Sequence, residues 1–128
     1  MKVRQLQTTN VCPRYHHAVE LIGRRWTGAI LMVLLQGASR FTDIVQSVPG
    51  LSDRLLSERL KELEAEGIVT REVHAETPVR IEYQLTPMGR DLSTVTGAVS
   101  TWAERWLPAQ QQEPELEASE TPELASVS

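Results

Sequence analysis

The sequence lacks several features on which whole classes of proteins depend. Its 128 residues contain a single cysteine, Cys12, which excludes an internal disulfide framework and a zinc site built from several cysteines. An inter-chain disulfide stays open if the protein is an oligomer. The chain contains no apolar run of about 18 residues, the length that a transmembrane helix needs. Because the N-terminal segment also lacks the apolar middle of a signal peptide, we expect a cytoplasmic protein with no membrane partner.

Signatures of catalysis are missing as well. The chain has no Gly-rich phosphate loop, no nucleophile accompanied by a base, and no paired carboxylates in an apolar setting. His16 and His17 are neighbours that diverge on a helix, and only Glu20 follows them at a ligand spacing. The sequence therefore predicts that the protein is not an enzyme and carries neither a metal nor a cofactor.

The net charge of −4 is unusual for a protein that binds nucleic acid, but the acidic residues are unevenly distributed. All 13 lysines and arginines and 12 of the 17 acidic residues lie in residues 1–107, which leaves this part at +1. Residues 108–128 hold five glutamates, three prolines and no basic residue, which predicts a disordered acidic tail. Residues 1–11 are expected to form a flexible arm, and residues 12–107 a single domain that remains open to a nucleic-acid partner.

The chain is organised around residues 41–67. Apolar side chains recur at the spacing of one helical face over residues 41–48, and Pro49-Gly50 then interrupts the pattern. Ser52 is suited to cap a second helix that ends near Glu66, and Gly67 is suited to a left-handed stop. Two helices joined by a short Gly-containing turn are the helix-turn-helix signature. We therefore predict that the second helix reads the major groove of DNA.

Two further helices are predicted before this motif. Cys12-Pro13 opens the first, because proline is suited to the first helical position, and Gly23 ends it. Residues 27–36 are apolar nearly all round, which predicts a helix in the middle of the fold. Residues 39–41 are a candidate for a minor strand.

A hairpin is predicted after the motif. Residues 68–74 read as a strand and residues 80–85 alternate between polar and apolar, with a turn at residues 75–78 between them. A hairpin directly after a helix-turn-helix is a wing. The predicted fold class is thus α+β, mainly α: a winged helix-turn-helix with N- and C-terminal dimerisation helices.

Thr86 and Pro87 are suited to open one long final helix. Its apolar stripe exceeds what a small winged domain needs for its own core, so we predict that part of it packs on a second subunit. The stripe consists of Leu92, Val95, Val99, Trp102 and Trp106. The alternative is that the helix folds back on its own domain.

A helical wheel sorts the residues of the second motif helix. With Leu56, Leu60 and Leu63 turned inward, Arg54, Glu58 and Lys61 point outward. The N-terminal half of a recognition helix usually enters the groove, so the candidate base-reading residues are Ser52, Asp53, Arg54, Ser57 and Glu58. Arg54 is the leading candidate because a guanidinium binds guanine O6 and N7 together, whereas Lys61 suits a phosphate. The alternative is a solvated face with an Arg54–Glu58 ion pair.

Other basic residues are candidates for backbone or minor-groove contacts. Arg80, next to the wing turn, suits a minor-groove or phosphate contact. Arg40 and Thr42, at the start of the first motif helix, can hold a phosphate there. Arg24 and Arg25 are weaker phosphate candidates, and Arg59 lies nearer the core and is expected to pack or to form an internal ion pair.

An ordered set of residues along the chain resembles the HxlR-type winged-helix transcriptional regulators, which are relatives of the MarR group. The matching residues cover about residues 12–107 and are Cys12-Pro13, Ile22-Gly23, Trp26-Thr27, Ile30-Leu31, Gly37, Arg40-Phe41, Leu51-Ser52, Leu56, Leu60–Glu64, Gly67–Val69, Arg71, Pro78, Arg80, Glu82-Tyr83, Leu85-Thr86, Gly89 and Trp102. Where the family commonly has a lysine before Trp26, this chain has Arg25, which keeps the charge. Val79 stands where the second proline of the wing is usual.

The resemblance implies a homodimer, built from the first and last helices, that binds a two-fold operator in double-stranded DNA. We expect it to act as a repressor, because repression by promoter occlusion is the more frequent outcome for a small regulator without an activation domain. On the first helix, Tyr15 and Val19 would join the dimer interface. The alternative is a winged-helix module that binds proteins without specific DNA binding.

Cys12 is a candidate sensor. It precedes a helix N-terminus with Arg14, His16 and His17 close in sequence, and both features raise the reactivity of a thiol. The resemblance adds that some family members respond to oxidants or electrophiles through a cysteine at this place. The alternative is that Cys12 is a small buried hydrophobic residue. A small-molecule effector bound near Trp102 or Trp106 also stays open.

Overall fold

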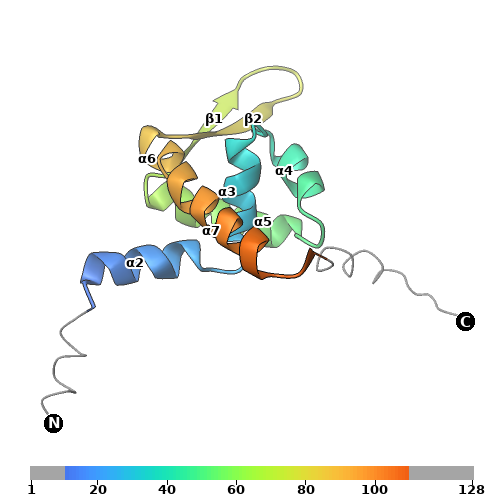
Figure 1. The fold of residues 1–128 in the computed structure, drawn as a ribbon. Coiled ribbons are helices and arrows are strands. Elements are labelled where there is room, and N and C mark those ends of the chain that lie inside the picture. The colour runs from blue at the N-terminus through green and yellow to red at the C-terminus, as the bar shows by residue number, and fades with distance from the viewer. Residues whose placement is uncertain (1–10, 110–128) are drawn as a thin grey trace, which may run out of the picture. The chain divides into compact units, whose positions relative to one another are not determined.

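The structure is a computed structural model, and it describes residues 11–109 (Figure 1). The chain divides into two compact units, residues 1–93 and residues 94–128. Nearly all of the predicted N-terminal arm and acidic tail lies outside the described residues. Within the described part, no helix is long and apolar enough to cross a membrane.

Helices dominate the described part of both units, with one small sheet in the first. The elements are α2 Pro13–Ile22, α3 Thr27–Leu35, α4 Phe41–Ser47, α5 Asp53–Ala65, β1 Val69–His74, β2 Arg80–Leu85, α6 Pro87–Arg90 and α7 Ser93–Trp106. This architecture confirms the predicted fold class of a mainly helical α+β protein.

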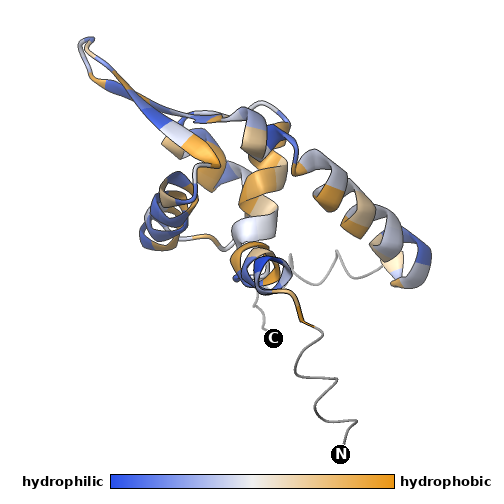
Figure 2. Ribbon diagram, turned by 90° about the vertical axis from the view of Figure 1, so that its left-hand side faces the viewer, coloured by the Kyte–Doolittle hydropathy of each residue, from blue (hydrophilic) through white to orange (hydrophobic). Residues whose placement is uncertain are grey.

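Helix α3 forms the centre of the first unit. Ile30 and Leu31 are fully buried, and the helix packs against α2, α4 and β2. Figure 2 shows the hydrophobic colour along this helix. Its all-round apolar sequence predicted this central position, and the helix ends at Leu35, one residue before the predicted end.

The helix-turn-helix forms as predicted. Leu56, Leu60 and Leu63 turn the inner face of α5 into the core, where each is at most 1% exposed. The Ser52 hydroxyl accepts a hydrogen bond from the Leu55 N–H at 3.1 Å, so it caps α5. Gly67 ends the helix with φ +84°, a left-handed conformation that suits glycine.

The wing is the antiparallel hairpin of β1 and β2, in which Val69 pairs with Leu85 at the base and His74 with Arg80 at the tip. Tyr83 and Leu85 pack against the core. The predicted minor strand before α4 is reduced to a single bridge between Arg40 and Glu82. The wing is therefore attached to α4 as well as to α5.

Thr86 joins the two ends of the wing. Its hydroxyl donates to the Gly67 carbonyl at 2.6 Å, and its N–H donates to the Ile68 carbonyl at 3.0 Å. The same hydroxyl accepts from the Gly89 N–H at 3.1 Å, which confirms Thr86 as a helix cap.

The prediction of one long final helix is wrong. Helix α6 stops at Arg90, residues 91–92 form a turn, and α7 begins at Ser93. The Leu92 N–H bonds to the Gly89 carbonyl at 3.0 Å, a tighter turn than that of an α-helix. Glycine, aspartate and serine have low helix propensity, which accounts for the break. Leu92, predicted to be the first residue of the stripe, instead lies in this turn and packs against the core.

Gly89 sits where α6 passes closest to the start of β1. A Cβ atom there would clash with the backbone carbonyl of Ile68 and lie 2.9 Å from Leu85. We expect Gly89→Ala to lower the free energy of unfolding by about 1–2 kcal/mol in urea titrations followed by circular dichroism. Gly28→Ala is the matched control, because nothing lies within 4 Å of its Cβ position and alanine favours the helix. Equal destabilisation of the two variants would contradict this packing argument.

Candidate nucleic-acid interface

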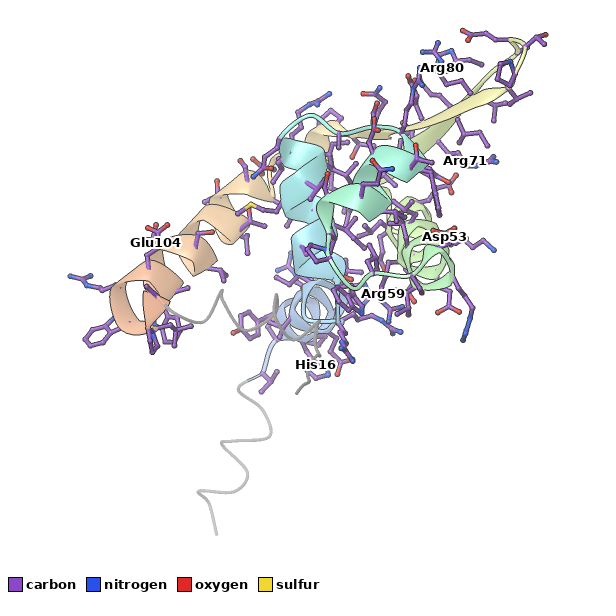
Figure 3. The ribbon with its side chains drawn as sticks, turned by 90° about the vertical axis from the view of Figure 1, so that its right-hand side faces the viewer. His16, Asp53, Arg59, Arg71, Arg80 and Glu104 are labelled. Atoms are coloured by element: carbon purple, nitrogen blue, oxygen red, sulfur yellow. The ribbon has the colours of Figure 1, made fainter. Side chains whose placement is uncertain are left out.

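The outward face of α5 is open to solvent over its N-terminal half. The Arg54 side chain is 80% exposed, and its Nε lies 3.6 Å from a Glu58 carboxylate oxygen. Such an exposed ion pair contributes little free energy, so Arg54 can exchange it for another partner at small cost. Of the other candidate residues, Ser52, Asp53 and Lys61 are also exposed, and Ser57 is half-buried. Figure 3 labels Asp53 at the start of this helix.

The inner side of α5 carries Arg59, which is only 8% exposed. Its Nε donates to the Arg25 carbonyl at 2.9 Å, and its Nη1 bonds to Glu62 at 3.2 Å. This confirms the prediction that Arg59 packs and pairs within the molecule.

The predicted contacts of α4 and of the wing come together around one hollow. Arg40 and Thr42 from the first turn of α4, and Arg80 from β2, line a cavity of about 400 Å³. Arg40 and Thr42 are exposed. The structure therefore gathers candidate phosphate-binding groups that lie about 40 residues apart in the sequence.

Arg80 is engaged by two carboxylates. Its Nη2 lies 2.9 Å from Glu76 and its Nη1 lies 3.0 Å from Glu82. His74 extends the network, with its Nε2 at 3.2 Å from Glu82 and 3.7 Å from Glu72. We call Glu72, His74, Glu76, Arg80 and Glu82 the wing cluster. Sequence reasoning missed it because the cluster depends on the hairpin register, which places Glu72 opposite Glu82 and His74 opposite Arg80.

Three members of the wing cluster could act as metal ligands. Ligand atoms of Glu72, His74 and Glu82 lie within 4.8 Å of one another. However, one Glu82 oxygen already accepts a hydrogen bond from Arg80, whose positive charge opposes the binding of a cation. We therefore interpret the wing cluster as an ion-pair network, and the absence of a metal stays a prediction.

The wing cluster predicts how a neighbouring carboxylate would affect the DNA contact expected of Arg80. In Glu76→Gln the guanidinium loses one of its two charged partners. We expect tighter DNA binding by about 0.5–1 kcal/mol and a steeper dependence on salt, measured by fluorescence anisotropy. Glu20→Gln removes the same charge from α2, where Glu20 pairs only with His16 among the described contacts, and serves as control. Weaker or unchanged binding by Glu76→Gln would argue against a DNA contact by Arg80.

The two arginines before α3 are partly engaged. The Arg25 guanidinium lies 5.1 Å from the centre of the Trp26 ring, a cation–π contact. Arg24 lies 3.3 Å from Glu62 on α5. Arg25 remains exposed and stays a weak phosphate candidate.

Cys12 is exposed, so the alternative of a buried hydrophobic residue is wrong. It occupies the N-cap position of α2, directly before Pro13. The backbone N–H groups of Tyr15 and Arg14, and to a lesser extent the Arg14 side chain, lower the pKa of the thiol below its ordinary value. Thiolate, the reactive form, is thereby favoured.

Large apolar side chains are exposed on α2 and on α7. Neither helix has a buried residue. Most residues predicted to form a dimer interface belong to this set: Tyr15, Val19, Val95, Val99, Trp102 and Trp106.

A family model described as HxlR-like helix-turn-helix matches residues 21–111. The chain belongs to the HxlR family. Its relatives include the uncharacterized HTH-type transcriptional regulator YvaP of Bacillus subtilis, 48% identical over 102 residues that cover 80% of this chain and 94% of YvaP. The HTH-type transcriptional regulator YodB of the same organism is 43% identical over 96 residues, covering 75% of this chain and 86% of YodB.

Solved structures of similar proteins share the fold. The reduced form of YodB from B. subtilis superimposes with a TM-score of 0.69 at 41% identity, covering 77% of this chain and 97% of YodB. The oxidized form of the redox regulator HypR gives a TM-score of 0.67 at 35% identity, covering 73% of this chain and 96% of HypR. The protein is thus a helix-turn-helix transcriptional regulator with the winged fold of these relatives.

Proposed function

We propose that this HxlR-family protein is a homodimeric cytoplasmic repressor that binds a two-fold operator and responds to oxidants or electrophiles through Cys12. It is not an enzyme in this proposal: its chemistry is DNA recognition and thiol modification. The observation that carries the proposal is the exposed, Ser52-capped N-terminal half of α5 inside a family-matched helix-turn-helix.

The DNA contacts divide into two kinds. Arg54 and its neighbours on α5 would read base edges in the major groove, because this exposed half of a recognition helix is the part that enters the groove. Arg40, Thr42 and Arg80, around the hollow between α4 and the wing, would hold the backbone without reading sequence. This arrangement would give one half-site per subunit.

A sensor role for Cys12 is supported by its chemistry and by the relatives. Structures of YodB include a diamide-treated and a quinone-bound form, and HypR is described as a redox regulator with oxidized and reduced forms. Cys12 is exposed and its pKa is lowered. Because it is the only cysteine, its oxidation would form a disulfide with Cys12 of a second copy or with a small thiol, and an electrophile would add to its sulfur.

Genome-wide footprinting with and without diamide tests the proposal. We expect protected sites with two-fold symmetry that are lost when the thiol oxidant is added. Cys12→Ser should keep the sites and lose the response to oxidant. Binding without symmetry or without a steep salt dependence would instead favour a protein-interaction module, and a response retained by Cys12→Ser would remove the sensor role.

The lowered pKa of Cys12 predicts a pH dependence of its alkylation. A lower pKa leaves more thiolate at neutral pH. As the pH is raised, the alkylation rate should therefore start to increase at a lower pH than it does for an unperturbed thiol. We expect the iodoacetamide rate profile to have its midpoint below that of a reference cysteine peptide measured in parallel. In Arg14→Ala the midpoint should rise by a small amount only. The backbone N–H groups, which stay in place in this variant, lower the pKa of Cys12 more than the Arg14 side chain does. A profile that coincides with the reference peptide would contradict this reactivity.

A further inference from the structure

Three polar contacts join α2 and the turn that follows it to the recognition helix α5 and its C-cap residue. His17 Nε2 lies 2.9 Å from Glu66, and Arg24 Nε lies 3.3 Å from Glu62. Arg59 donates to the carbonyl of Arg25, just beyond the end of α2, at 2.9 Å. We call these three contacts the polar bridge. They join residues that lie between 34 and 49 positions apart in the sequence.

The polar bridge contacts follow each other in order along both segments. Residues 17, 24 and 25 ascend in the chain while their partners 66, 62 and 59 descend. On α5 the three partners are spaced by three or four residues, so they form one stripe along the helix about 10 Å long. Because Leu56, Leu60 and Leu63 already hold α5 in the core, the polar bridge acts on α2. One contact would let α2 pivot, whereas three contacts along a stripe restrain the orientation of α2 and of the turn after it relative to α5.

Apolar packing of α2 is limited to its last turn, where the half-buried Leu21 and Ile22 pack against the core. Helix α2 has no buried residue, and a hollow of about 320 Å³ lined by both helices lies at their junction. The His17 and Arg24 side chains are 65% and 50% exposed, so their pairs contribute little to stability. Polar contacts that stabilise weakly can still select one relative orientation out of several that a loosely packed junction allows.

We infer that the polar bridge sets the position of the recognition helix relative to the dimerisation helix, with His17 and Arg24 as its positioning residues. The inference rests on the proposed function, in which α2 joins the dimer interface and α5 reads a half-site. The orientation of α5 on α2 then sets the distance between the two recognition helices and thereby the operator spacing. The polar bridge thus makes specificity for spacing depend on residues outside the proposed base-reading face of α5.

The first test needs neither DNA nor a dimer. Cys12→Ser removes the only thiol, after which Arg14→Cys on α2 and Lys61→Cys on α5 supply two exposed sites for spin labels. Diluting labelled chains into unlabelled protein isolates the distance within one chain, which pulsed electron spin resonance measures. We expect His17→Ala/Arg24→Ala to broaden the distance distribution and His16→Ala to leave it unchanged. His16 is the matched control because it pairs with Glu20 inside α2. Equal widths in all proteins would overturn the inference and leave the proposed function standing.

The second test uses operator DNA. We expect His17→Ala/Arg24→Ala to bind the natural two-fold operator about three- to tenfold more weakly than the unmodified protein. Affinity for a single half-site should change by less than about twofold, and operators with altered half-site spacing should be discriminated less. An equal loss on half-site and full operator would overturn the inference, since the contacts would then support α5 itself. Failure of the unmodified protein to bind any operator would instead count against the proposed function, which the spin-label experiment does not require.

Discussion

Trp102→Ala should weaken the proposed homodimer by about 2–4 kcal/mol, the range of an interface hot spot. Trp102 is 58% exposed on α7, and Val99 and Trp106 lie three and four residues away on the same face. A tryptophan that becomes buried removes about 150–250 Å² from water. Two subunits that are linked in a dimer bind the two half-sites of an operator more tightly than two separate subunits do. Loss of the dimer should therefore also lower the affinity for the operator strongly.

Sedimentation velocity over a dilution series measures the dimerisation of Trp102→Ala, and anisotropy measures its operator binding. Glu104→Ala is the control, because residue 104 points to the opposite side of α7 from residue 102. A dimer that survives Trp102→Ala unchanged would remove α7 from the proposed interface.

Arg54→Ala should cost about 1–3 kcal/mol on the operator and relax the sequence preference at one position in each half-site. The reason is that alanine cannot replace the bidentate contact with guanine that we propose for the Arg54 guanidinium. The cost of releasing Arg54 from Glu58 is small, since that pair is exposed and 3.6 Å long.

A library of operator variants measures the effect of Arg54→Ala. Lys61→Ala is the matched control: Lys61 lies on the same outward face but farther along α5, so its loss should weaken all sequences evenly and reduce the salt slope. Unchanged operator binding by Arg54→Ala would show that another face of α5 meets the bases.

Local patterns in the sequence predicted the elements that position the recognition helix. The all-round apolar run gave the central α3, and Ser52 and Gly67 marked the ends of α5 through capping chemistry that depends on only a few neighbouring residues. The outward position of Arg54 followed from the helical period alone. Such features need no knowledge of distant contacts.

Features that depend on distant contacts could not be predicted in this way. The engagement of Arg80 requires the hairpin register, and the bridge from His17 to Glu66 requires the packing of two helices 49 positions apart. The break after Arg90 was not predicted. Thr86 and Pro87 strongly indicate the start of a helix, whereas the low helix propensity of the residues around the break is a weaker signal.

Thr86 has a consequence for how this fold can diverge. Its contacts with Gly67 and Ile68 close the base of the wing at one point. A segment closed at its base can change length at its tip cheaply, because the entropy of a loop grows slowly with the number of residues. We therefore expect that residues can be inserted at the tip of the hairpin at small cost in stability, while the recognition helix and the core keep their places.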